Sequence, residues 1–241
     1  MSSVRFSVVI PTYNRAHLIL KTLNSVLNQS FRDFEILVVD NCSTDNTCEV
    51  LSQVLDSGKV KFIRHDRNYE RAKSRNTGME NAQGEYVTFL DSDDLMWRSN
   101  LEDADTYIME NPDIRFFHNL YNIVSTDNKM IYSPRFPRTK NLAKAIASGN
   151  FLSCIGVFIH KEVYQGIRFD TNSLLTGSED HEFWLRVAAK YSRLGRINKV
   201  NSSLVSHGER SFNIKNIDDI RRRYQYIIKK IQEDTSLSLF S

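Results

Sequence analysis

The stretch YVTFLDSDD, residues 86–94, decides the fold. Its first five residues are mainly apolar, β-branched or aromatic, which predicts a buried strand. The strand ends in Asp91, Asp93 and Asp94, three carboxylates within four residues. Carboxylates grouped in this way repel one another unless a cation lies between them. The stretch predicts a site for a hard divalent cation such as Mg²⁺ or Mn²⁺, completed by water and phosphate oxygens. Taken alone, such a pattern is more often a solvated acidic turn that caps the next helix.

Strands and helices alternate strictly on the N-terminal side of this stretch. Strands are predicted at 6–10, 34–39, 60–63 and 85–90, and helices at 18–29, around 50–55 and at 72–82. We expect Pro11 to end the first strand. The alternation predicts a mostly parallel central sheet with helices on both faces. It also brings the turns at 11–15, 40–45 and 91–94 to one crevice, because ligands of open α/β sheets bind beyond the carboxyl ends of the strands.

The second half of the chain is less regular. The predicted helices are 100–110, 142–147, one that starts near Glu179, and a terminal one over 217–231; the predicted strands are 114–122, 129–132, 155–159 and 204–207. A basic loop with two prolines, 133–140, is a candidate mobile segment. The terminal helix carries an apolar stripe and several basic residues. It either packs on the domain or rests on anionic lipid, and Asp218, Asp219, Glu233 and Asp234 weaken the lipid alternative.

Length and composition exclude several classes of protein. A chain of 241 residues is long enough for one large α/β domain. The net charge of +3 is too small to indicate nucleic-acid binding. Cys42, Cys48 and Cys154 lack metal-site spacing and predict reduced thiols in the cytoplasm. Neither a signal peptide nor an apolar stretch long enough to span a bilayer is visible, so any membrane contact is expected to be peripheral.

Phosphate binding, if it occurs, requires a metal and basic side chains. The chain has neither a Gly-x-Gly-x-x-Gly motif nor a glycine-rich loop that ends in Lys-Ser/Thr. Arg71, Lys73 and Arg75 are the candidates, and a solvated basic face is an equally good interpretation. Asp40 and Asn41 follow a strand and suit hydrogen bonds to a nucleoside, although the turn that contains them also suits helix capping.

Two later positions have both a chemical and a structural interpretation. Glu179 and Asp180 begin a predicted helix, where carboxylates are favoured by the free N–H groups. A carboxylate fixed on a helix can also act as a general base toward a hydroxyl group. His207 follows the last predicted strand; it is either structural or a ligand of a metal such as Mn²⁺, which accepts imidazole more readily than Mg²⁺ does.

Taken together, the motifs are specific. They are SVVIPTYN (7–14), VVDNCSTD (38–45), Arg75-Asn76-x-Gly78, GEYVTFLDSDD (84–94), and Glu179-Asp180 followed by Trp184 and Arg186. In this order they resemble the family 2 glycosyltransferases, closely over 6–97 and more loosely over 177–207. The resemblance implies a GT-A fold: a single domain over 1–214, with a nucleotide-sugar half (1–97) and an acceptor and catalytic half (98–214), followed by a basic helix and tail (215–241).

The resemblance also implies roles for individual residues. Pro11 and Tyr13 would flank a nucleobase, Asp40 and Asn41 would meet the base and ribose, Asp91 and Ser92 would lie by the ribose and the metal's waters, Asp93 would bind Mn²⁺ or Mg²⁺, and Asp180 would be the catalytic base. Thr12, Arg15, Arg71, Arg75 and Glu179 complete the expected donor site, with His207 as a second candidate metal ligand. The implied reaction is inverting transfer of a hexose or N-acetylhexosamine from a UDP-sugar to a glycan hydroxyl, expected to be lipid-linked, in surface polysaccharide synthesis.

Two departures from the family's pattern affect the nucleobase. Many members have a second aspartate where this chain has Asn41, and glycine where it has Cys42. An amide oxygen accepts a hydrogen bond more weakly than a carboxylate, so thymine and guanine stay open beside uracil. Two other functions stay open as well: nucleotidyl transfer to a sugar phosphate, and a non-catalytic sugar-nucleotide or glycan-binding module. Residues 98–175 show no matching motif, and the acceptor cannot be identified from them.

Overall fold

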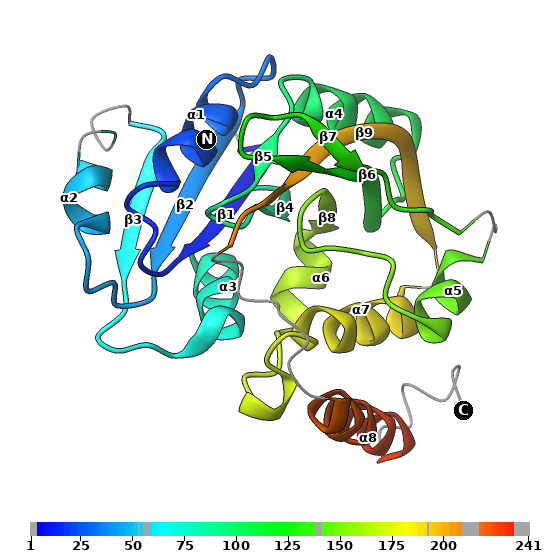
Figure 1. Ribbon diagram of the computed structural model, residues 1–241. Helices are drawn as coiled ribbons and strands as arrows, with labels where there is room; N and C mark the ends of the chain where they lie inside the picture. The colour runs from blue at the N-terminus through cyan, green and yellow to red at the C-terminus, as the bar shows by residue number, and fades with distance from the viewer. Residues whose placement is uncertain are drawn as a thin grey trace.

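The computed structural model describes residues 4–52, 54, 58–137, 141–191, 193–208 and 217–233. Its first half is the predicted strand–helix repeat: β1 (Phe6–Thr12), α1 (Ile19–Leu27), β2 (Phe34–Asp40), α2 (Thr47–Ser52), β3 (Val60–Arg64), α3 (Glu70–Asn81) and β4 (Tyr86–Phe89). The four strands lie parallel in the order β3-β2-β1-β4 (Figure 1). Position 55, which we assigned to the second helix, lies outside the described residues.

Pro11 does not end the first strand, contrary to our prediction. β1 continues to Thr12, where Pro11 pairs with Val39 and Thr12 pairs with Asp40. The pairing of β1 with β4 stops earlier, at Val9 and Phe89. A proline is tolerated in a strand where its missing N–H has no acceptor to meet, and this end of β1 has a ladder only toward β2.

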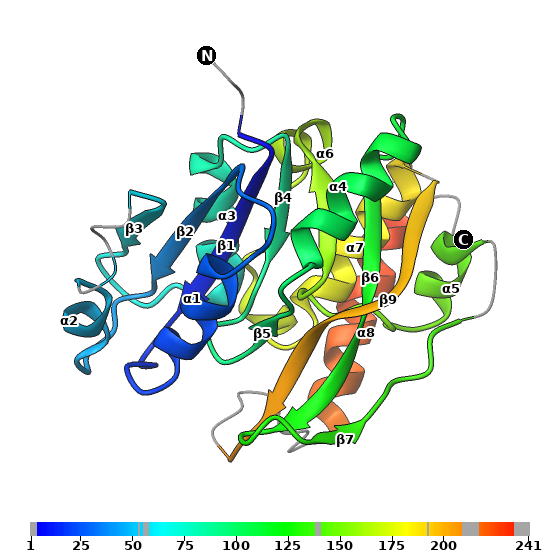
Figure 2. The same cartoon turned by 90° about the horizontal axis from the view of Figure 1, so that it is seen from above.

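The second half adds antiparallel strands to the same sheet. Its elements are β5 (Leu95–Met96), α4 (Asn100–Glu110), β6 (Phe116–Ser125), β7 (Met130–Tyr132), α5 (Leu142–Ser148), β8 (Val157–His160), α6 (Lys161–Gly166), the 3-10 helix η2 (Ser173–Leu175), α7 (Glu179–Lys190), β9 (Leu194–Ser206) and α8 (Ile217–Glu233). β8 is antiparallel to β4 and β6. β9 is parallel to β6, and β7 forms a hairpin with β6 (Figure 2). The nine-stranded sheet is therefore mixed, with its continuous parallel part in the first half.

β9 is much longer than the strand that we predicted at 204–207. The missed part includes Asn201, Ser202 and Ser203, which are polar yet fully buried. Their partners explain this: Asn100 donates its side-chain amide to the Asn201 carbonyl at 2.7 Å, and the Ser203 hydroxyl bonds to Asn122. A buried strand whose polar groups are satisfied in this way shows no alternation of apolar residues. The short elements β5 and α6 were also not predicted.

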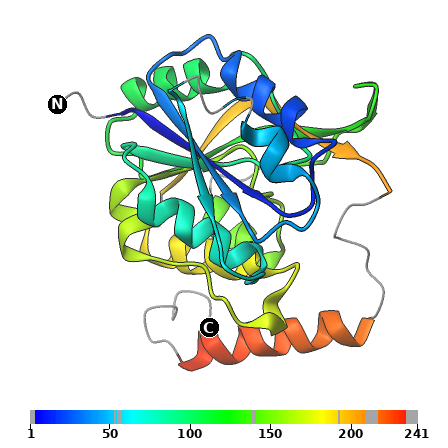
Figure 3. The ribbon, with the colours of Figure 1, turned by 90° about the vertical axis from the view of Figure 1, so that its left-hand side faces the viewer.

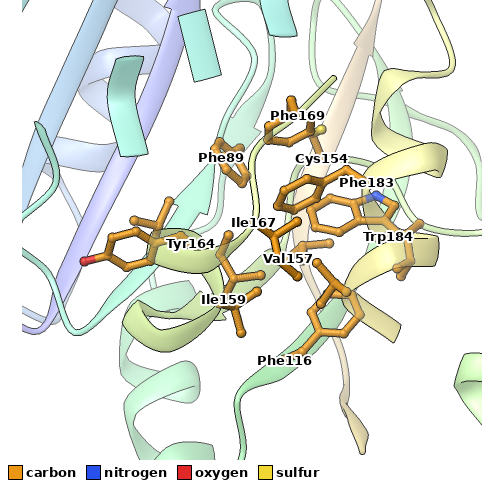
Figure 4. Close-up of a cluster of buried hydrophobic side chains, with 14 of the residues drawn as sticks. Phe89, Phe116, Cys154, Val157, Ile159, Tyr164, Ile167, Phe169, Phe183 and Trp184 are labelled. Atoms are coloured by element: carbon orange, nitrogen blue, oxygen red, sulfur yellow. The ribbon is translucent and has the colours of Figure 1, made fainter. Parts of the chain in front are cut away.

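Two apolar clusters lie on opposite faces of the sheet, as the alternation along β1 shows. Val8 and Ile10 join a cluster with α1, α2 and α4, whereas Val9 joins a cluster with α3, α5, α6 and α7. The second cluster is aromatic: Phe169 stacks on Phe183 with ring centroids 4.0 Å apart, and Trp184 stacks on Phe116 at 5.5 Å (Figure 4). It anchors α7, the helix that starts at Glu179, against the sheet.

The terminal helix α8 packs on the domain with part of its predicted apolar stripe, whereas Tyr224 and Ile228 of that stripe are exposed. Ile227 is 3 % exposed and belongs to the cluster beside α7, with Tyr226 and Ile231 packed against it. Figure 3 shows α8 lying along the outside of the domain, beneath α7. Among the described helices, none combines the length and apolar character needed to cross a membrane.

Candidate active site

A pocket of about 460 Å³ lies where the carboxyl ends of β1, β2 and β4 meet the start of α3. Nine of the residues that we predicted for the site line it: Pro11, Thr12, Tyr13, Arg15, Asn41, Arg71, Asp91, Ser92 and Asp93. The predicted Asp40, Arg75, Glu179, Asp180 and His207 are not among the lining residues. The sheet edge thus brings the three turns together as the strand order predicts.

The rim of the pocket is held by bonds between the turns after β1 and β2. The Asn14 N–H donates to the Ser43 hydroxyl at 2.9 Å, and the Arg15 N–H donates to the Thr47 hydroxyl at 2.9 Å. The side-chain oxygen of Asn14 accepts in return from the Thr44 N–H at 2.8 Å. These hydrogen bonds hold the backbone beside Tyr13. The Tyr13 side chain is 40 % exposed and can stack on a planar ligand.

Asp40 is fully buried and does not face the pocket. Its carboxylate accepts from the Ser43 N–H at 3.1 and 3.2 Å and from the Ser43 hydroxyl, and it lies 3.4 Å from the Arg64 guanidinium. These contacts are those of the capping turn that we kept as an alternative. Asp40 therefore supports the pocket rim indirectly, by holding Ser43 in place.

Asn41 shares the pocket wall with Asn68. The Asn41 amide group donates to the side-chain oxygen of Asn68 at 2.7 Å, and its own oxygen accepts from the Tyr69 N–H at 2.9 Å. His65 lies 3.0 Å from the same Asn41 oxygen. The Asn41 side chain thus joins the end of β2 to the loop before α3: its N–H group donates to Asn68, and its oxygen accepts from Tyr69.

The acidic turn after β4 divides into residues with different tasks. Ser92 is buried in the pocket wall, and Asp91 is a quarter exposed there. Asp94 is fully buried, and its carboxylate accepts from the Val205 N–H of β9 at 2.9 Å. Asp94 therefore fastens the turn to β9, which is a structural task.

Asp93 and His207 meet at the edge of the pocket, although they lie 114 positions apart in the sequence. The His207 Nε2 lies 3.0 Å from the Asp93 carboxylate, and the Arg15 guanidinium lies 3.6 Å from the same oxygen. No group of three or more His, Cys, Asp or Glu side chains suitable for a metal occurs among the described residues. One carboxylate and one imidazole fit Mn²⁺ or Mg²⁺ if phosphate and water supply the remaining positions.

Arg75 lies behind the pocket and connects its acidic wall to α7. The side chain is 2 % exposed; one nitrogen lies 2.9 Å from Asp91 and another 2.9 Å from Glu179. This position does not support our expectation that Arg75 binds phosphate, because both ends of its guanidinium already meet carboxylates. Arg71, one turn earlier, does line the pocket, where its Nε lies 3.6 Å from Glu179.

Asp180 follows Glu179 in the first turn of α7. Burial of its carboxyl group, followed by the negative charge of Glu179, raises the pKa of Asp180 to about 6. Arg75, the His181 N–H at 2.7 Å and the side chain of Asn150 act in the opposite direction. A carboxylate with this pKa is ionised at neutral pH and is a better proton acceptor than a solvated one.

A comparison with protein families identifies the family of this chain. The family model described as glycosyl transferase family 2 matches residues 7–168, more than half of the chain. The chain belongs to glycosyl transferase family 2. The match ends before α7, so the region of Glu179 and Asp180 lies beyond the part that the family model covers.

Individual relatives of this family 2 member support the assignment. An uncharacterized glycosyltransferase from Rickettsia conorii is 31 % identical over 221 residues, which are 88 % of this chain and 35 % of the relative. The chain thus spans about a third of the length of that protein. The poly(ribitol-phosphate) β-N-acetylglucosaminyltransferase TarS from Staphylococcus aureus is 38 % identical over 110 residues, 44 % of this chain and 19 % of TarS.

Solved structures establish the GT-A fold of this family 2 chain. The structure of TarS residues 1–349 in complex with UDP-GlcNAc superimposes with a TM-score of 0.78 at 24 % identity, over 96 % of this chain and 67 % of that one. The mannosyltransferase PcManGT from Pyrobaculum calidifontis, in complex with GDP-Man and Mn²⁺, gives a TM-score of 0.66 at 22 % identity over 95 % and 64 % of the two chains.

Several residues of the site were not predicted from the sequence. Asn68, Glu70 and Ser74 line the pocket, and Asn150 contacts Asp180. Asn68 could have been predicted, because it lies in the loop after β3 and ligands bind beyond the carboxyl ends of strands in such sheets. Asn150 carries no comparable signal, because it lies in a stretch between α5 and β8 whose place in the fold is set by long-range packing.

Proposed function

We propose that this family 2 protein is an inverting glycosyltransferase that moves a hexose or N-acetylhexosamine from a UDP-sugar to a hydroxyl group of a glycan or polyol acceptor. One observation carries the proposal: buried Arg75 joins the pocket wall at Asp91 to Glu179, the neighbour of Asp180. A donor-binding turn and a proton acceptor are thereby held in one frame, which is what displacement at a sugar carbon requires.

The donor's nucleoside would lie between Tyr13 and the Asn41–Asn68 pair. The Asn41 oxygen already accepts hydrogen bonds from the Tyr69 N–H and from His65. The amide group of Asn68 is therefore the better candidate to bind a nucleobase. Asn68 lines the pocket, and no described residue accepts a hydrogen bond from its amide group. An N–H donor suits a carbonyl oxygen of uracil. The sequence and structural similarity to TarS, which was solved with UDP-GlcNAc, supports the choice of a UDP-sugar.

The diphosphate would lie along the acidic turn. Asp93 and His207 would hold Mn²⁺ or Mg²⁺, and Arg15 and Arg71 would contribute further positive charge toward the phosphates. When bound, the metal neutralises the charge that develops on the leaving nucleotide. The lining of the pocket supports this placement, because Arg15 and Arg71 line it together with Asp91, Ser92 and Asp93.

Asp180 would accept the proton of the acceptor hydroxyl as the new glycosidic bond forms. Attack from the face opposite the leaving nucleotide inverts the anomeric carbon, so that an α-linked donor gives a β-linked product. Asn150 and the His181 N–H would fix the carboxylate in place. TarS acts on poly(ribitol-phosphate), by its name, which supports a hydroxylated surface polymer as the acceptor. Cytoplasmic location, a lipid-linked acceptor and membrane contact stay predictions.

Replacing Asp93→Asn should remove the metal-dependent part of donor binding. An amide supplies no charge to a hard cation, and we expect the affinity for UDP-GlcNAc in Mn²⁺ to fall by at least roughly 10- to 100-fold, the loss typical of weakened metal sites. Calorimetric titration measures it. The control is Asp113→Asn, an exposed acid remote from the pocket. With a chelator present, wild type and variant should bind alike. Equal affinity of the two proteins in Mn²⁺ would show that Asp93 is not a ligand.

A further inference from the structure

The terminal helix α8 packs against the segment that carries the proposed base. Figures 1 and 3 show α8 next to α7 and to the loop that precedes it. Ile227 of α8 is buried in the same cluster as Phe183 and Trp184 of α7, and the Tyr224 ring lies 6.0 Å from the ring of His181, the residue after Asp180. α8 therefore reaches the first turn of α7.

Lys230 of α8 makes a three-way contact at this interface. Its ammonium group lies 2.7 Å from the Asp170 carboxylate and 2.6 Å from the Glu182 carboxylate. The Tyr226 hydroxyl donates to the same Asp170 oxygen at 3.0 Å. Lys230 is partly buried, and Glu182 is 3 % exposed, so these pairs are shielded from solvent. Such shielded pairs hold geometry better than exposed ones.

Asp170 and Glu182 bracket the segment with Glu179 and Asp180. Glu182 lies in the first turn of α7, where it also pairs with Arg186 at 2.7 Å. Asp170 follows Phe169, and the Phe169 backbone is bonded on both sides by the Asn76 amide, at 2.9 and 2.8 Å. α3 thus holds this segment from the pocket side and α8 holds it from the opposite side.

We propose that Lys230 is a positioning residue for the proposed base: together with Tyr226 it clamps the ends of the 170–182 segment and thereby fixes Asp180. The inference rests on the proposed function. It assigns a task in the reaction to α8, which the family match at 7–168 does not include. No residue of α8 lines the pocket, so loss of the clamp should affect turnover and leave donor binding unchanged.

The test compares Lys230→Met with its neighbour Lys229→Met in the full chain. Lys229 is 72 % exposed, and its nearest acid is Glu233 of the same helix, at 3.7 Å, so its replacement controls for the lost charge. The assay is hydrolysis of UDP-GlcNAc with Mn²⁺, in which water replaces the unknown acceptor. We expect turnover by Lys230→Met to fall roughly tenfold, within the range for mutations along a coupled network. Its affinity for UDP-GlcNAc should match the wild type, Lys229→Met should behave as wild type, and Lys230→Arg should restore most of the rate.

A double-mutant cycle separates positioning of the base from a general loss of structure. If Lys230 acts through Asp180, Lys230→Met should cost nothing further in an Asp180→Asn background. The same tenfold loss in both backgrounds, or wild-type turnover by Lys230→Met, would overturn the inference while the proposed function stands. A wild-type protein that binds no UDP-GlcNAc and hydrolyses none would overturn the proposed function and the inference with it. If Lys230→Met fails to fold, Tyr226→Phe replaces it, because this variant removes a single hydroxyl group from the same clamp. Its turnover is then compared in the wild-type and Asp180→Asn backgrounds in the same way.

Discussion

The Asp180→Asn protein should bind UDP-GlcNAc and Mn²⁺ as the wild type does, and turn the donor over roughly 10²- to 10⁴-fold more slowly, the usual contribution of a positioned general base. The amide fills the same space and keeps the contacts of the Asp180 side chain, but it cannot take a proton from the attacking hydroxyl. Binding should be unaffected because Asp180 does not line the donor pocket. Release of UDP at saturating donor measures the turnover.

The pH dependence of turnover provides a second measure of the same group. Its raised pKa of about 6 means that Asp180 is protonated, and inactive as a base, below this pH. The wild-type rate should therefore rise as the pH increases through about 6 and level off above it, whereas the residual rate of Asp180→Asn should lack this rise. Near-normal turnover by Asp180→Asn, or the same pH profile in both proteins, would show that another group accepts the proton.

Replacing Arg75→Met should destabilise the fold by about 3–5 kcal/mol, the cost of removing one partner of a buried ion pair. Glu179 would keep its place in the interior, 4 % exposed, without its closest cation, and Asp91 would lose the same partner. Arg75 also lowers the pKa of Asp180, so the midpoint of the pH–rate profile should move upward. Urea unfolding, monitored by tryptophan fluorescence, measures the free energy of unfolding.

Arg71→Met is the matched control for this prediction. Arg71 lies on the same helix and faces the same Glu179 carboxylate, but its side chain is 30 % exposed and the distance is 3.6 Å. Partly exposed pairs contribute about 0–1 kcal/mol, and we expect Arg71→Met to weaken donor binding more than stability. Comparable stability losses in the two variants would show that Arg75 is not the buried link between the two halves of the site.

The sequence predicted the local elements of the site well, because each has a short-range signal. The apolar run into Asp91, the turns after β1 and β2, and the Glu179-Asp180 pair at a helix start are all visible in hydrophobic periodicity and capping chemistry. The order of the parallel strands then places the turns at one edge. The predicted pocket residues Tyr13, Arg71 and Asp93 are found there together.

Contacts between distant segments could not be predicted in this way. Arg75 looks like any basic residue of an exposed helix, and only the fold reveals that Asp91 and Glu179 enclose it. The length of β9 was hidden because Asn201 and Ser202 are buried polar residues, whose partners lie about 100 positions away. The clamp at Lys230 has the same character, since its two carboxylates come from other elements.

The anomeric configuration of the released sugar tests the central claim most directly. With UDP-GlcNAc as the α-linked donor, Mn²⁺ present and water as the acceptor, proton NMR in the first turnovers, before mutarotation, distinguishes the two anomers. A single displacement assisted by Asp180 predicts β-GlcNAc as the first product. Initial formation of α-GlcNAc would contradict the account, because retention requires two displacements or attack from the face of the leaving nucleotide.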